Sequence, residues 1–550
     1  MNGLWWLAVV MAPVLGAMCL WYRPRTTIPW LWVTCAPALL AAFQPPAALV
    51  PAWLWPGAEW GATDDIRRIF LALTGLVWGC ATVFAAARRP AAGEARFWLF
   101  WLLALTGNLL AVISRDGPGF YVGFSIMSLS AYGLVVHPGG REQRRAGRIY
   151  LQMALAGEML LFAGLTLRIH ETGSVNLGDW QAHALPPLTG ALLIAGFGIK
   201  MGFWPLHLWL PPAYRAAPAP GAAVLSGSMM KVGVLGLWLF MPEAGPWLRD
   251  WTPWLLALGA VSAFYGVMAG LLQRDAQTVL AYSSVSQAGY LLVIQALAWH
   301  QPAVRESWGL LLAFFAVHHA TAKSALFLGA GLAGNVRLGR WHWLLMALPA
   351  LALAGLPPTT GMVVKNLIKK GLADDTLEAW IPLLSLGSLA TGLLVLHALW
   401  RMYRAGPAPG EGDKAHPLRV YPWAVLSLAP LVLPWLWPAM NEPWRKALAP
   451  DALWSAIWPL LVAGGIAALA MVRGWRPPGR LAYRLGPGLS LSSGIIGVLN
   501  RLSLPALEYA GGGRWWRQWE RRWNRLWRET NPITLSGWLL FLLLLLGWLW

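Results

Sequence analysis

The sequence of 550 residues is poor in charge: only 12% of its residues are Asp, Glu, Lys or Arg, whereas 57% are hydrophobic. A soluble globular protein carries roughly 25% charged residues. A large soluble protein would need charged outer faces on its helices, and most of the long apolar runs here have none. Runs of about 20 apolar residues are long enough to cross a bilayer as helices. The composition therefore indicates an all-α polytopic membrane protein.

Residues for metal, redox or nucleotide chemistry are also scarce. The three cysteines, Cys19, Cys35 and Cys80, each lie in an apolar run, and none belongs to a C-x-x-C pair. Neither a zinc site nor an iron–sulfur cluster is supported by that spacing. No G-x-G-x-x-G or P-loop stands at a strand-to-helix junction. We therefore expect no cofactor, no metal and no catalytic site of the chain's own.

Positive charge is what the sequence does have, with a formal net charge of +19. The loops on one side of the predicted spans hold 28 Lys and Arg residues, and those on the other side hold 10. By the positive-inside rule the richer side faces the cytoplasm, which places both termini on the non-cytoplasmic side. The first basic residues follow the first apolar stretch, unlike those of a cleaved signal peptide. The basic excess is thus a topology signal of a cell membrane protein, as in a bacterial inner membrane, and requires no nucleic acid.

The apolar runs predict about 14–16 transmembrane helices, arranged in six segments. These are N-terminal transmembrane helices over 1–94, a first five-helix repeat over 95–245, a second, inverted five-helix repeat over 246–405, C-terminal transmembrane helices over 406–475, a cytoplasmic-side segment over 476–532, and a final transmembrane helix over 533–550. The 476–532 segment contains an amphipathic interfacial helix with a stripe of tryptophans. That helix suits either a headgroup anchor or a lateral arm against a neighbouring subunit.

Four lysines, and no arginine, lie inside the predicted spans: Lys200, Lys231, Lys323 and Lys365. A charge at mid-bilayer costs at least ~2.5–3.5 kcal/mol on insertion scales. A lysine near a helix end avoids that cost by raising its ammonium group to the interface. Such snorkelling fits Lys369 and Lys370, in the loop after the span 343–368, and is an alternative for Lys365. Lys200, Lys231 and Lys323 sit many residues from either end of their spans. We expect these lysines to be functional.

Buried lysine is suited to proton relay, because burial disfavours its charged form while arginine stays protonated. Glu158 is the one acidic residue well inside a span and is the expected partner of a lysine. His319 precedes Lys323 by four residues, so both side chains face the same way on one helix. The predicted supporting polar residues are His207, His318, Gln287, Ser283 and Ser286. Metal binding by the histidines is the rival interpretation, but no acidic or thiol ligand lies near them.

Prolines interrupt two of the long apolar spans, Pro205 within 185–210 and the pair Pro357 and Pro358 within 343–368. A proline in a spanning helix removes a backbone hydrogen bond, and broken helices at membrane depth are tolerated where they line a cavity. Lys200 lies just before the first break and Lys365 just after the second. Two interrupted helices five spans apart indicate inverted repeats of five helices, each containing a broken helix.

Four motifs occur in order between residues 95 and 402: "GFGIKMGFWPLHLWLPPAYRAAPAPGAAVLSGSMMKVGVLG", "RDAQTVLAYSSVSQAGYLL", "HHATAKSALFLGAG" and "GLPPTTGMVVKNLIKKG". They resemble the antiporter-like subunits of respiratory complex I, of Mrp-type cation/proton antiporters and of hydrogenase-4-type membrane complexes. The resemblance implies proton-transfer roles for Lys200, Lys231, His319, Lys323 and Lys365.

The chain departs from that family's pattern at two positions. Ser125 stands where the family usually has a glutamate on helix five, and Pro212 replaces an acidic residue after the first break. Glu158, one helix later, is the candidate to pair with Lys200 instead.

The sequence thus predicts a proton-translocating subunit of a multisubunit membrane complex, with the energy source in partner subunits. Those partners could be antiporter-like subunits, redox or hydrogenase subunits, or a cytoplasmic protein. Three alternatives remain open: an Mrp-type cation/proton antiporter subunit, the membrane subunit of an inorganic-carbon (bicarbonate/CO2) uptake complex driven by proton motive force, and a non-transporting assembly scaffold.

Overall fold

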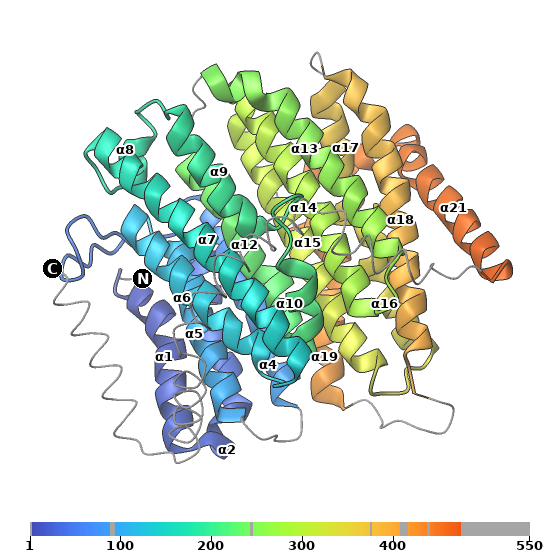
Figure 1. Ribbon diagram of the computed structural model, residues 1–550, viewed down its shortest axis with the longest axis horizontal. Helices are drawn as coiled ribbons and strands as arrows, with labels where there is room; N and C mark the ends of the chain where they lie inside the picture. The colour runs from blue at the N-terminus through green and yellow to red at the C-terminus, as the bar shows by residue number, and fades with distance from the viewer. Residues whose placement is uncertain are drawn as a thin grey trace, which may run out of the picture. The chain divides into compact units, whose positions relative to one another are not determined.

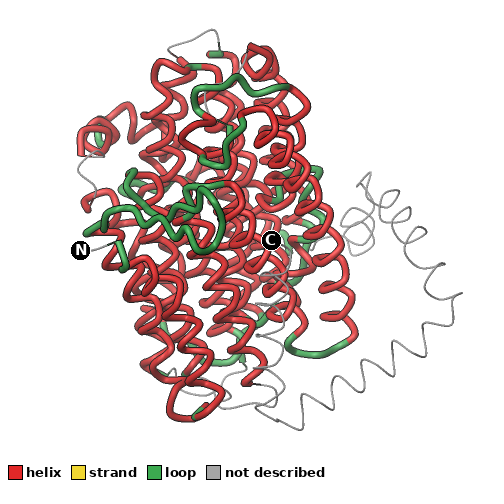
Figure 2. The backbone as a smooth tube through the Cα atoms, turned by 90° about the vertical axis from the view of Figure 1, so that its left-hand side faces the viewer, coloured by secondary structure: helices red, strands yellow, loops and turns green. Residues whose placement is uncertain are grey.

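The computed structural model describes residues 3–87, 94–241, 246–373, 377–407, 416–436 and 441–474. Helices make up nearly all of this backbone, as Figure 2 shows in red, and the described residues contain no extended strand, only three isolated bridges. The predicted amphipathic helix and the predicted span at 533–550 lie outside the described residues. The all-α class is confirmed.

Three of the five helices before the first predicted repeat are short. They are α1 (Trp5–Tyr22), α2 (Pro24–Thr27), the 3-10 helix η1 (Ile28–Cys35), α3 (Ala36–Phe43) and α4 (Asp65–Ala86). The sequence predicts a span over 28–46, and residues Pro24–Phe43 do form a candidate span, which consists of α2, the 3-10 segment η1 and the short helix α3.

The next two groups of helices hold the predicted site residues. The first group is α5 (Glu94–Ile113), α6 (Gly117–Val136), α7 (Arg141–Thr172), α8 (Leu177–Trp180), α9 (Pro187–Met201), α10 (Leu210–Ala216), α11 (Ala219–Val224), the π-helix η2 (Leu225–Met229) and α12 (Met230–Phe240). The second group is α13 (Pro246–Leu271), α14 (Ala276–His300), η3 (Pro302–Val304), α15 (Arg305–Ala333), α16 (Arg340–Ala354), α17 (Thr360–Ala373), η4 (Glu378–Trp380) and α18 (Ile381–Arg404). The described chain ends with α19 (Pro417–Leu436), α20 (Asn441–Ala447) and α21 (Pro450–Val472).

Among the described residues, 11 helices are long and apolar enough to cross a membrane. Four other predicted spans in the described residues are not among these 11. Two are the broken pairs α9/α10 and α16/α17, one is α14, which carries several Ser and Gln residues, and one is α19, whose apolar stretch Pro417–Leu433 is shorter. The protein is therefore a multi-pass membrane protein, with its helices lying side by side (Figure 1).

Glycines bring two helix pairs into backbone contact. A Cβ at Gly123 of α6 would lie 2.5 Å from the Ala111 backbone nitrogen of α5. A Cβ at Gly266 of α13 would lie 2.5 Å from the Ser286 backbone nitrogen of α14. Small residues permit such close approach between membrane helices. These pairs open the two predicted five-helix repeats, whose relationship and boundaries remain predictions.

Both helix breaks begin at a glycine in the left-handed conformation. Gly202 follows α9 with φ +70, and its N–H bonds to the Gly198 carbonyl 2.9 Å away. Gly355 follows α16 with φ +100. Glycine adopts this conformation without steric cost. The prolines come two or three residues later, where they prevent the helix from resuming at once.

Candidate functional site

Lys200 is buried in the last turn of α9, just before the first break, and is 6% exposed. Its Nζ donates a hydrogen bond to Ser128 Oγ of α6, 2.9 Å away, and lies 5.4 Å from the centre of the Phe124 ring. Glu158 of α7 is equally buried and close enough for its charge to interact with Lys200. The two do not form an ion pair within 4.0 Å, and Glu158 Oε1 has no hydrogen-bond partner in the described chain. The predicted partners are thus neighbours without direct contact.

Lys231 follows the π-helix and has no exposed surface. The Met230 N–H bonds to the Leu225 carbonyl five residues back, and the Ser226 carbonyl accepts a hydrogen bond from Lys231 Nζ at 2.6 Å. Single π turns inside α-helices often occur at functional sites. Here the wider turn gives a buried ammonium group an acceptor within its own helix.

A row of contacts links Lys231 with Lys323 of α15 through Ser226, whose carbonyl accepts from Lys231 and whose hydroxyl contacts Ser284. Ser226 Oγ and Ser284 Oγ are 3.0 Å apart, and Ser284 Oγ donates to the Leu280 carbonyl at 3.4 Å. Lys323 Nζ donates to the same carbonyl at 2.6 Å. Two fully buried lysines on different helices are therefore linked through Ser284 and the Leu280 carbonyl of α14.

Buried polar groups beside this row lack partners within the described chain. They are Ser283 Oγ, Ser286 Oγ, both amide atoms of Gln287 and both ring nitrogens of His319. His319 interacts electrostatically with Lys231, Lys323 and His318. Buried polar groups normally hydrogen-bond to protein or to ordered water. These positions therefore suit water molecules that bridge the lysines.

Lys365 lies near the second break on α17 and is 6% exposed. Its Nζ donates to the carbonyl of Ala354, the last residue of α16, at 3.0 Å and lies 5.5 Å from the centre of the Tyr290 ring. His318 Nδ1 and Thr360 Oγ1 are 2.6 Å apart, which ties α15 to the start of α17. His318 also interacts electrostatically with both Lys365 and Lys231.

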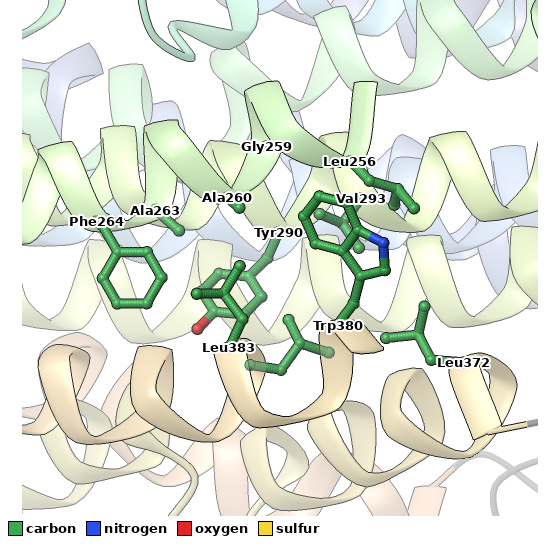
Figure 3. A pocket seen from close by; sticks show the side chains of 11 residues that line it. Leu256, Gly259, Ala260, Ala263, Phe264, Tyr290, Val293, Leu372, Trp380 and Leu383 are labelled. Atoms are coloured by element: carbon green, nitrogen blue, oxygen red, sulfur yellow. The ribbon is translucent and has the colours of Figure 1, made fainter. Parts of the chain in front are cut away.

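The side of Tyr290 away from the lysines is apolar. Its ring borders a small pocket lined by side chains of α13, α14, α17 and α18, among them Ala263, Phe264 and Leu383 (Figure 3). Val261 and Met268, also on α13, are exposed.

Two further buried histidines, His207 and His397, do not lie in the row. His207 sits in the turn between α9 and α10, where its Nε2 is 3.2 Å from Tyr265 Oη of α13. His397 of α18 contacts the Gln273 carbonyl at 2.9 Å. Both serve as links between helices, and only His207 was predicted to support the site.

The sequence analysis did not predict a buried cluster of polar side chains that contact one another on α4, α5 and η2. Ser228 Oγ lies 3.1 Å from Asn108 Oδ1 and 3.2 Å from Thr74 Oγ1, and Thr74 Oγ1 lies 3.1 Å from the same Asn108 oxygen. Asn108 is fully buried. An asparagine in the apolar run "LLALTGNLLAVI" is the signal that could have revealed it.

In the part of the chain that is described, no three His, Cys, Asp or Glu residues form a group that could hold a metal ion. The side chains that converge are lysines, histidines, serines and glutamine. Lysine and histidine can accept and release protons, and serine and glutamine can hydrogen-bond the water molecules between them.

Comparison with known proteins identifies the family of the chain. A sequence profile described as NADH:quinone oxidoreductase/Mrp antiporter, TM, matches residues 114–393. NADH-quinone oxidoreductase subunit N of Desulforudis audaxviator is 30% identical over 391 residues, which cover 65% of this chain and 75% of that protein. A subunit of the Na(+)/H(+) antiporter of Bacillus subtilis is 26% identical over 382 residues, covering 64% and 76%.

Hydrogenase-4 component B of Escherichia coli is 28% identical over 291 residues, covering 48% of this chain and 43% of that protein. Among solved structures, a chain of the Mrp complex from Dietzia sp. DQ12-45-1b superposes with a TM-score of 0.68 at 20% identity, covering 83% of this chain and 99% of that chain. That likeness shows the shared fold. Together with the profile match, these relatives establish that the chain belongs to the NADH:quinone oxidoreductase/Mrp antiporter transmembrane family.

Proposed function

We propose that this chain is a proton-translocating, antiporter-like subunit of a multisubunit membrane complex. Protons pass between Glu158, Lys200, Lys231, His319, Lys323 and Lys365. Its relatives bear the names of subunits of NADH-quinone oxidoreductase, hydrogenase-4 and Na(+)/H(+) antiporters. The energy that drives transport comes from partner subunits.

The observation that carries this proposal is the row from Lys231 to Lys323 through Ser226, Ser284 and the Leu280 carbonyl. Burying two amines with no carboxylate in contact costs free energy of folding, and a function in transport explains why the chain carries them. A scaffold that only packs against its neighbours does not need them. The retained lysines therefore favour transport over the scaffold alternative.

The sidedness of the helices forms part of the same proposal. The excess of arginine in alternate loops supports a cytoplasmic location for the loops that follow α6 and α18 and a non-cytoplasmic location for both termini. Inverted repeats would open one helix break toward each side of the membrane. Lys200 and Lys365 would then lie nearest to water on opposite sides.

The test is proton flux through the complex, purified with its partner subunits and reconstituted in liposomes. Lys323→Ala should abolish flux while the complex still assembles, and the exposed Lys370→Ala should serve as the matched control. Because a charge crossing 100 mV is worth ~2.3 kcal/mol, the path must be gated, so the subunit alone should leak protons slowly or not at all. Rapid conduction that survives Lys323→Ala would contradict the proposal.

A further inference from the structure

A second lysine continues the polar line beyond Lys365. Lys369 lies four residues further along α17, about 6 Å along the helix axis and close to the same face. Its Nζ donates a hydrogen bond to Ser455 Oγ of α21 at 3.0 Å. The sequence placed Lys369 in a loop beyond a span ending at residue 368, but α17 runs to Ala373. The structure corrects that boundary and turns a loop lysine into a half-buried helix residue.

The C-terminal helices of this same chain cover α17 at this place. Met362 and Val363 of α17 pack with Trp444 and Ala447 of α20 in a small core cluster of their own. Figure 1 shows α21 beside α18, at the end of the helix row. Lys369 therefore faces a seam between α17 and α21 and not open lipid.

Asn366 supplies a further polar group in the turn between the two lysines. Its Nδ2 is buried and has no hydrogen-bond partner in the described chain. Buried amide groups of this kind normally bind ordered water. Lys365, Asn366, Lys369 and Ser455 together form what we call the α17 seam, and the charges of its two lysines interact.

We propose that Lys369 is the proton-release residue of this chain. Protons pass along the α17 seam from Lys365 to Lys369 and leave at the surface where α17 ends. The Lys365 ammonium gives a proton through water to the neutral Lys369 amine. Lys369 then gives one proton to water outside, and the buried lysines of the row reprotonate Lys365, so each amine gains one proton and loses one. This inference rests on the proposed function and adds the exit to it.

A merely structural lysine would behave differently on substitution. If Lys369 only ties α17 to α21, arginine should replace it, because arginine keeps both the positive charge and a donor for Ser455. If Lys369 releases protons, arginine should fail and histidine should work in part, since imidazole exchanges protons near neutral pH.

The experiment measures proton flux and subunit assembly for Lys369→Arg, Lys369→Gln and Lys369→His in the reconstituted complex. We expect the Arg and Gln variants to lose at least about tenfold in flux and the His variant to recover part of it. Lys370→Gln, a neighbouring exposed lysine, is the matched control and should keep wild-type flux. Full flux in Lys369→Arg would overturn the inference, and if Lys323→Ala still abolishes flux, the proposed function itself would stand.

Thiol labelling provides a readout that does not depend on transport. Asn366→Cys, in a chain whose three natural cysteines are replaced by alanine, should react with a charged, membrane-impermeant thiol reagent from one side of the membrane only. That side should be the one at which α17 ends. Absence of labelling from both sides would show that the seam is dry and would refute the exit route.

Discussion

Gly266→Ala adds one methyl group where α13 crosses α14. The new Cβ would lie 2.5 Å from the Ser286 backbone nitrogen and 2.6 Å from the Tyr282 carbonyl oxygen. Backbone atoms cannot rotate away as a side chain can. The helices would have to separate by about 0.9 Å to restore an ordinary 3.4 Å contact. Overpacking of this kind costs ~1–3 kcal/mol.

The substitution should reduce proton flux as well as stability, because α14 carries Ser284 and the Leu280 carbonyl. A shift of α14 by that distance would displace Ser284 from the position in which its Oγ lies 3.0 Å from Ser226 Oγ. We therefore expect the thermal midpoint of the complex to fall by a few degrees. Proton flux should fall further than this loss of stability explains.

Gly465→Ala on α21 is the matched control. A Cβ at Gly465 would meet nothing within 4 Å. Alanine also favours the helix over glycine by ~0.8–1.0 kcal/mol, so this variant should be as stable as the wild type or slightly more so. Thermal melting of the detergent-solubilised complex, followed by flux in liposomes, compares the two. Equal behaviour of Gly266→Ala and Gly465→Ala would refute the packing argument.

Two further predictions concern the first break. Lys200→Ala and Lys200→Arg should both abolish proton flux while assembly persists, and full transport by the Arg variant would rule out a relay role for Lys200. If Glu158 replaces the carboxylate missing at Ser125, Glu158→Ala should lose flux and the added change Ser125→Glu should restore part of it. A double variant no better than Glu158→Ala would contradict the proposed exchange of positions.

Much of the architecture could be predicted from the sequence because membrane spans leave a strong signal. The long apolar runs and the relatives establish the helical membrane fold, and the four interior lysines could be found because each one interrupts such a run. The two breaks were also readable, since proline and glycine end helices for stereochemical reasons.

The contacts of the lysines were not predictable in the same way. Lys231, Lys323 and Lys365 all donate to backbone carbonyls, and every residue has a carbonyl, so no residue type marks these acceptors. Nothing in the sequence distinguishes Ser128, which accepts a hydrogen bond from Lys200, from the other serines in the predicted spans. The end of α17 was also missed, because an apolar pattern that fades into lysines does not show whether the helix stops or continues.

The π-helix before Lys231 has a consequence for the rotational phase of α12. Each residue of an α-helix turns the chain by about 100°. The wide turn over Leu225–Met229 takes up more residues per turn than the α-helix around it, so α12 starts out of phase with α11. A regular α-helix over the same residues would leave the span apolar and continuous, yet it would rotate Lys231 by about 100° around the helix axis, because an α-helical turn holds one residue fewer than the wide turn. The helix could then still cross the membrane with the Lys231 ammonium group turned away from α14, which makes the wide turn, and not only the composition of this segment, part of the site.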